Sequence, residues 1–149
     1  DEEKKFTLVM SQYEKSTTTH YTLRAYATCP FRMHRLTSAW KGKAEVTGEW
    51  RGVTAGGCAN HRETYGNNPK FQLDLEGGRG TVLLELKGPK EFNVGLDVLG
   101  EDTKLSSGPF RPGYVYLEAE LAGGSYQVVT STYRPGQQGP FILSVQGTG

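Results

Sequence analysis

Short stretches of alternating apolar and polar residues, separated by Gly and Pro, recur along most of the chain and limit what it can fold into. In residues 71–76, the apolar side chains of Phe71, Leu73 and Leu75 alternate with polar ones. This period of two is typical of a half-buried β-strand. With 20 Gly, 7 Pro and 8 Tyr, the composition favours short strands joined by tight turns. The sequence therefore predicts an all-β fold.

About nine segments are expected to form strands, and an antiparallel two-sheet β-sandwich is the economical way to pack them. The expected strands are residues 6–10, 20–27, 44–50, 71–76, 81–87, 92–99, 114–121, 126–133 and 141–145. We expect residues 1–43 to form an N-terminal hairpin and connector, and 44–149 to form the sandwich, in one compact unit. Gly95 suggests a bulge in its strand.

A long stretch between Trp50 and Phe71 follows neither the helical nor the strand period. Its recurring residues are turn formers, because Gly56 and Gly57 tolerate positive φ and Asn68 precedes a proline. We predict an ordered loop held at both ends by buried aromatic side chains. Such a loop is either a functional loop or a structural crossover.

The first predicted hairpin repeats the last one. Sliding the chain so that Val9 falls on Val129 also places Ser11 on Ser131, Tyr13 on Tyr133 and Leu23 on Leu143 without a gap. A period this long suits a duplicated whole domain rather than a solenoid. We therefore hypothesise that residues 1–27 are the closing hairpin of a preceding sister domain, or its local equivalent. The chain begins at Asp1 without Met, so we expect a piece of a longer protein.

Three motifs and their order resemble one family. Thr54-Ala-Gly-Gly-Cys58 precedes Asn68-Pro69-x-Phe71, and Ser131-Thr-Tyr-x-Pro135 lies near the far end. This combination resembles calpain domain III, the C2-like β-sandwich that follows the protease core of calpains, over residues 44–147. The repeated hairpin is similar to the tandem C2-like domains of the PalB-like branch, in which this chain would be the distal one. The residues that carry the resemblance are Trp50, Gly56, Gly57, Cys58, Asn60, Asn68, Pro69, Phe71, Ser131, Thr132, Tyr133, Pro135 and Gly139.

The sequence departs from the family pattern at two places. Conventional calpains have a long acidic insertion after the Asn-Pro-x-Phe strand, whereas here residues 76–80 form a short connection. Thr130 stands where the family usually has Pro.

The resemblance implies a non-catalytic regulatory or interaction domain of an intracellular cysteine protease whose catalytic core lies elsewhere in the parent. Such a domain would position the protease core or dock partners. The implied partners are that core, the sister C2-like domain and, through the parent, ESCRT-III-related proteins. The alternative is a phospholipid- or calcium-binding C2-type membrane-targeting module. We expect a cytoplasmic protein, with nuclear or endosome-associated locations left open, because neither a signal peptide nor a spanning apolar run is present.

The sequence contains few residues in patterns that would bind a metal ion or catalyse a reaction. Asp97, Glu101 and Asp102 could supply calcium ligands, but a dedicated site has a denser carboxylate set, so we expect no tight calcium site, no zinc site and no cofactor. Cys58 and His61 have the residue types of a thiol protease, yet neither lies in a matching family motif, so a buried structural Cys58 is the preferred interpretation. Two isolated thiols, Cys29 included, are expected to be reduced and buried.

Charge excludes one class of partner. Lys plus Arg number 17 against 16 Asp plus Glu, a net charge of +1, so we expect no nucleic-acid binding. A local basic group could still contact lipid headgroups or a partner, although a solvated connector is the simpler interpretation. Its members are Arg32, Arg35, Trp40, Lys41 and Lys43, with Arg24 and His34 nearby.

Overall fold

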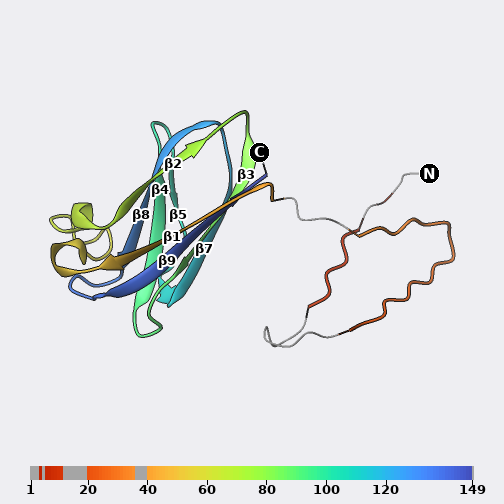
Figure 1. Ribbon diagram of the computed structural model, residues 1–149, viewed down its shortest axis with the longest axis horizontal. Helices are drawn as coiled ribbons and strands as arrows, with labels where there is room; N and C mark the ends of the chain where they lie inside the picture. The colour runs from red at the N-terminus through yellow and green to blue at the C-terminus, as the bar shows by residue number, and fades with distance from the viewer. Residues whose placement is uncertain (1–3, 5, 12–19, 36–39, 149) are drawn as a thin grey trace. The chain divides into compact units, whose positions relative to one another are not determined.

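The computed structural model describes residues 4, 6–11, 20–35 and 40–148. The chain divides into two units, 1–35 and 36–149, rather than the one compact unit expected from the sequence. Each unit is described by itself. The second unit contains every strand that the described residues form (Figure 1).

The second unit is a sandwich of two antiparallel sheets, as predicted (Figure 1). The four-stranded sheet has the order β1-β9-β3-β7, and the five-stranded sheet has the order β2-β8-β4-β5, with β6 also pairing β4. The strands are β1 (Gly42–Trp50), β2 (Lys70–Leu75), β3 (Gly80–Lys87), β4 (Asn93–Leu99), β5 (Lys104–Ser106), β6 (Arg111–Pro112), β7 (Tyr114–Leu121), β8 (Gly124–Thr132) and β9 (Gly139–Gly147).

Alternation along each strand places one set of side chains between the sheets. Leu84 and Leu86 of β3 face Val94, Leu96 and other buried residues of β4 in a single apolar cluster. Such burial supplies most of the stabilisation of a sandwich of this size. The fully buried Trp50 packs on Phe141 of β9, with ring centroids 4.5 Å apart.

Gly48 of β1 makes room for that aromatic pair. A Cβ at this position would lie 2.4 Å from Cζ of Phe141. The glycine therefore sits where a ring crosses the strand, a role that glycine can fill because it has no side chain.

Seven of the predicted strands match β1 to β4 and β7 to β9 to within a few residues. Two short strands, β5 and β6, were missed inside the loop expected at residues 100–113. The predicted bulge at Gly95 is wrong, because β4 pairs with β8 in unbroken register from Val94↔Thr132 to Leu99↔Gln127. Gly95 instead lies under the ring of Phe110, which a Cβ would approach to 2.6 Å.

The first unit does not show the two expected strands. Residues 6–11 and 20–27 are described without any strand. An isolated two-stranded hairpin is marginally stable in water, and the apolar side chains here, such as Phe6 and Tyr21, are exposed. Residues 12–19, which join the two expected strands, lie outside the described residues.

The expectation that Cys29 is buried is wrong. It is exposed, not buried, because it lies in a bend of a segment whose described residues are all exposed. No helix of the part of the chain that the structure describes is long and apolar enough to cross a membrane.

Candidate functional site

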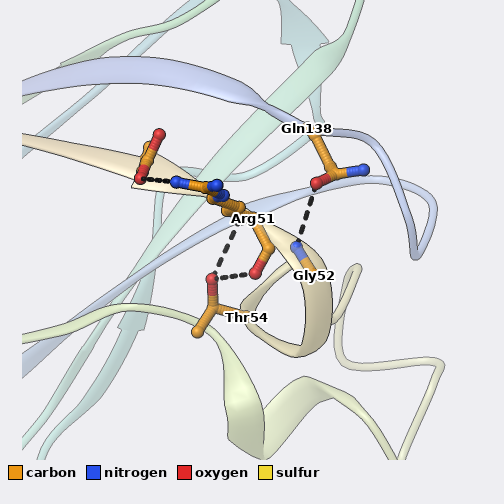
Figure 2. Close-up of polar contacts among 5 residues, drawn as sticks. Arg51, Gly52, Thr54 and Gln138 are labelled. Atoms are coloured by element: carbon orange, nitrogen blue, oxygen red, sulfur yellow. Dashed lines mark hydrogen bonds and ion pairs between the residues drawn. The ribbon is translucent and has the colours of Figure 1, made fainter.

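The long loop between β1 and β2 begins with a tight turn that the far end of the chain holds in place. The backbone N–H of Arg51 donates to Oγ1 of Thr54 at 3.0 Å, and this hydroxyl donates back to the Arg51 carbonyl at 2.8 Å. The turn is the 3-10 helix η1 (Gly52–Thr54). Figure 2 shows that Gln138, in the loop between β8 and β9, accepts a hydrogen bond from the Gly52 N–H at 3.0 Å.

Asn68 fixes the other half of the loop from inside. Its Oδ1 accepts a hydrogen bond from the Gly56 N–H at 3.1 Å, and its Nδ2 donates to the carbonyl oxygens of Gly57 at 2.7 Å and Tyr65 at 3.0 Å. Asn68 is 3% exposed, and its bonds to Gly56 and Gly57 are buried, whereas its bond to Tyr65 is part-buried. The side chain thereby substitutes for a strand partner, and it follows the second 3-10 turn, η2 (Tyr65–Asn67).

The two adjacent glycines permit close backbone packing. A Cβ on Gly56 would lie 2.1 Å from the Thr64 carbonyl oxygen, and one on Gly57 would lie 2.6 Å from the Pro135 nitrogen. Gly57 also has a φ of 75°, which disfavours other residues. Gly56 is therefore needed for the long loop to pack on itself, and Gly57 for the β8–β9 loop to lie against it.

Backbone hydrogen bonds complete that junction. The Cys58 N–H donates to the Tyr133 carbonyl at 3.3 Å, and the Gly136 N–H donates to the Ala55 carbonyl at 2.8 Å. The motif of the long loop and the motif that begins at Ser131 thus meet at one end of the sandwich. Of the remaining predicted positions, Asn60 and Pro135 are exposed, Pro69, Phe71 and Gly139 are half-buried, and Thr132 is buried.

The loop also covers part of the outer face of the five-stranded sheet. Val129 and Ser131 alternate with the inward-facing residues of β8, yet they are 0% and 1% exposed. Tyr65 crosses from the loop to β4, where its hydroxyl donates to Oδ2 of Asp97 at 2.5 Å. Burial, this hydrogen bond and the carboxylate charge all raise the pKa of Tyr65 above its usual range.

Cys58 is 4% exposed, as predicted, but it lies outside the main apolar cluster. Its contact with His61 is a backbone one, in which the His61 N–H donates to the Cys58 carbonyl at 2.9 Å. Because His61 is exposed and the thiol is buried, their arrangement does not supply the thiol–imidazole pair that nucleophilic catalysis needs.

Two buried hydroxyls of β8 have no hydrogen-bond partner: Thr130 Oγ1 and Ser131 Oγ.

Of the acidic residues considered for calcium, Glu101 and Asp102 are exposed, whereas Asp97 accepts a hydrogen bond from the protein. Asp97 accepts the Tyr65 hydroxyl, and Asp74 accepts bonds from Ser125 and Gln72 that lower the pKa of Asp74. Among the described residues, no group of three or more His, Cys, Asp or Glu could hold a metal ion. The expectation of no tight calcium site stays a prediction.

The basic residues considered for a lipid or partner surface fall in both units. Arg32 and Arg35 are exposed in the first, while Lys41 and Lys43 are exposed and Trp40 half-buried at the start of the second. The structure therefore does not place them on one surface.

A cavity of about 580 Å³ opens on the side of the sandwich where both sheets end. Its walls are the edge strands β1 and β2 and the inner faces of β3 and β9. The apolar lining includes Val46, Phe71, Leu73, Leu75 and Val145, and the charged residues at its mouth are Lys43, Asp74 and Glu76. This cleft was not predicted from the sequence, because its residues have the pattern of ordinary inward-facing strand positions.

Sequence reasoning also missed Tyr65, Gln138 and Phe110, which fix the loops. A signal existed for Phe110 alone, since a glycine inside the otherwise apolar strand β4 marks a place where another group approaches closely.

Comparisons with known proteins agree with this architecture. The family model described as calpain large subunit, domain III, matches residues 46–93. Calpain-7 of Sus scrofa is 41% identical over 93% of this chain, and the calpain-like protease palB/RIM13 of Aspergillus oryzae is 34% identical over 94% of it. The chain spans 18% of the length of each of these relatives.

A solved structure shares the fold alone. The pre-peptidase C-terminal domain of a collagenase from Bacillus anthracis aligns with a TM-score of 0.51 at 9% identity, covering 69% of this chain and 88% of that one. The family match, the similarity to calpain-7 along most of the chain and the two-sheet sandwich lead to one conclusion: the chain belongs to the calpain domain III family.

Proposed function

We propose that this chain is a non-catalytic docking domain of a calpain-type cysteine protease, which positions the protease core or holds partners. The observation that carries the proposal is the similarity to calpain-7, which extends over 93% of this chain but only 18% of that protein. The buried Cys58 and the exposed His61 add support, since they lack catalytic geometry. The parent would be cytoplasmic, with nuclear or endosomal pools, and would meet ESCRT-III-related proteins through other domains.

The self-similarity supports a sister domain as one intramolecular partner. Val9 and Tyr21 are 78% and 70% exposed, whereas their counterparts Val129 and Phe141 are 0% and 2% exposed between paired strands. Residues 1–27 would therefore find their strand partners in a preceding C2-like domain, and this chain would be the distal one of a tandem.

The proposal is tested in the full-length parent with and without residues 36–149. Loss of the domain should reduce the recovery of partners by pull-down, or change the rate of substrate cleavage, while an isolated 149-residue chain shows no cleavage. An unchanged partner set and an unchanged rate would overturn the docking role. Hydrolytic activity of the isolated chain that is lost on Cys58→Ala would show that the domain is itself an enzyme.

A lipid- or calcium-binding module is the second candidate, and the exposed Lys41 and Lys43 at the start of β1 favour its lipid-binding form. A ligand that binds only the native state raises the melting temperature. Anionic vesicles or calcium should then raise the Tm of the chain, and Lys41→Glu with Lys43→Glu should remove the vesicle effect. An unchanged Tm with both ligands would reject this candidate.

A further inference from the structure

The cleft between β1 and β2 exposes residues that a closed sandwich would bury. Along β1, Ala44 and Val46 are in phase with the buried Trp50 and therefore point between the sheets, yet both are exposed, Val46 to 40%. On the opposite side of the sandwich, β7 lies against β4. The apolar core is thus covered on one side and open on the other.

Both walls of the cleft are strand edges. Among the strands that the described residues form, β1 pairs only with β9, and β2 pairs only with β8. Each edge strand therefore presents alternate backbone N–H and C=O groups that no strand of the sandwich uses. An occupant that suits the cleft must satisfy these polar groups and also fill the apolar space between them.

The charged residues at the mouth of the cleft limit the kind of ligand that it can bind. Asp74 and Glu76 belong to the β2 side, and Lys43 belongs to the β1 side. Two carboxylates against one ammonium give a negative balance, which opposes an anionic lipid headgroup and suits a basic side chain. An acyl chain would also leave the strand edges unpaired, whereas a peptide backbone would pair with one of them.

From the apolar cleft, its free edges and its charge we propose that it binds an extended peptide segment of a partner protein, with apolar side chains at alternate positions and basic residues at one end. The segment adds a strand to β1 or β2 and inserts its apolar side chains between the sheets. The inference rests on the proposed docking role and names the surface that performs it. A cavity of about 580 Å³ holds several side chains of valine size.

A labelled probe peptide tests the proposal on the 149-residue chain. In the probe, valine and threonine alternate over about seven positions after two N-terminal arginines, which matches the length of one edge strand. Fluorescence anisotropy should show saturable binding. A probe with the same side chains but N-methylated at every amide of the valine–threonine stretch has no N–H to donate to either strand edge and should bind at least about tenfold more weakly.

Variants locate the binding. Val46→Lys places a charge in the cleft at an already exposed position and should weaken probe binding at least about tenfold. The matched control is Val53→Lys, which changes an 80% exposed valine in η1 and should leave binding unchanged. Asp74→Asn combined with Glu76→Gln should weaken binding several-fold and reduce its salt dependence, since both carboxylates are removed. Circular dichroism verifies that each variant is folded.

The outcomes separate this inference from its alternatives. Equal binding by Val46→Lys and the unchanged chain, or equal binding of the N-methylated probe, would overturn it. A third outcome would assign the cleft to lipid instead. In that outcome the chain does not bind the probe but sediments with phosphatidylcholine vesicles containing about 20% phosphatidylserine, and Val46→Lys reduces this sedimentation. Failure of the probe together with partner loss on deletion of residues 36–149 would reject this surface while leaving the docking role intact.

Discussion

The indole Nε1 of Trp50 donates a hydrogen bond to the carbonyl oxygen of Thr130 at 3.0 Å, which joins the two sheets through the core. Trp50 ends β1 in one sheet, and Thr130 lies in β8 of the other. The Thr130 N–H in turn donates to the Pro69 carbonyl at 3.2 Å. Both ends of the long loop are therefore attached to the same residue of β8.

Trp50→Phe should destabilise the fold by about 1–3 kcal/mol, because it removes a buried donor and shortens a packed side chain. Urea unfolding monitored by circular dichroism measures the change. Tyr26→Phe, at an 87% exposed position, serves as the control and should be neutral. Equal midpoints for Trp50→Phe and the control would contradict the importance of this bond.

Asn68→Ala should cost about 3 kcal/mol, since three hydrogen bonds of about 1 kcal/mol each disappear, two of them buried and one part-buried. Its neighbour Asn67 is exposed, so Asn67→Ala is a matched control with an expected loss below about 0.5 kcal/mol. Chemical denaturation distinguishes them, and similar losses for both variants would show that the loop does not depend on the Asn68 side chain.

Three alanine substitutions should form a graded series. Gly66 has open space and no positive φ, so Gly66→Ala should change stability least. Gly52→Ala should cost about 1–2 kcal/mol from its φ of 53° alone. Gly57→Ala should cost more than Gly52→Ala, because it adds a clash with Pro135 to the same backbone strain. Melting temperatures give the order, and a Gly57→Ala variant as stable as Gly66→Ala would refute the close packing of the two loops.

Stability should fall at alkaline pH through Tyr65. Its pKa is raised in the folded state, so the folded chain holds the proton more tightly than the unfolded chain does. The resulting stabilisation is complete below the unfolded pKa of about 10 and is lost as pH rises above that value. Urea midpoints between about pH 8 and pH 11.5 measure the loss.

Tyr65→Phe should lower stability at neutral pH and make the alkaline decline shallower. The decline should not vanish, because the hydrogen bond to Glu85 and its burial raise the pKa of Tyr114 to about 12. Tyr114 is 40% exposed, so solvent screening makes its share the smaller one. An alkaline slope unaltered by Tyr65→Phe would assign the decline to other groups.

The two thiols should react at very different rates. Cys29 is exposed and Cys58 is buried, so Ellman's reagent should titrate one thiol promptly in the native chain and the second only after unfolding in urea. Cys29→Ser should abolish the fast phase. Prompt reaction of both thiols in the native state would contradict the burial of Cys58.

The strand periods predicted most of the sandwich because its inward-facing positions are apolar and its turns contain glycine or proline. Leu84 and Leu86 show the pattern plainly, since each alternates with a more exposed residue. The strands expected at residues 6–10 and 20–27 failed for a physical reason. Alternation shows that a segment suits a sheet, but it does not supply the neighbouring strands that stabilise one.

The candidate sites were harder to predict than the strands. The Gly56-Gly57 pair and Asn68 were identified as turn formers, but the contact of Gly57 with Pro135 depends on long-range packing that local sequence does not encode. The cleft was missed for the opposite reason. Val46 has the pattern of a core residue, and only the separation of β1 from β2 leaves it exposed.

The long loop depends on residues that the ribosome synthesises much later than the loop itself. Gly52 is bonded to Gln138 and Trp50 to Thr130, partners that are 86 and 80 residues later in the sequence. During synthesis, residues 50–71 emerge well before β8 and β9, so Thr130 and Gln138 are not yet available to bond with them. Contacts of such high sequence separation slow folding and lengthen the exposure of apolar segments. A nascent chain that stops before β8 therefore has a translated loop but no native loop conformation.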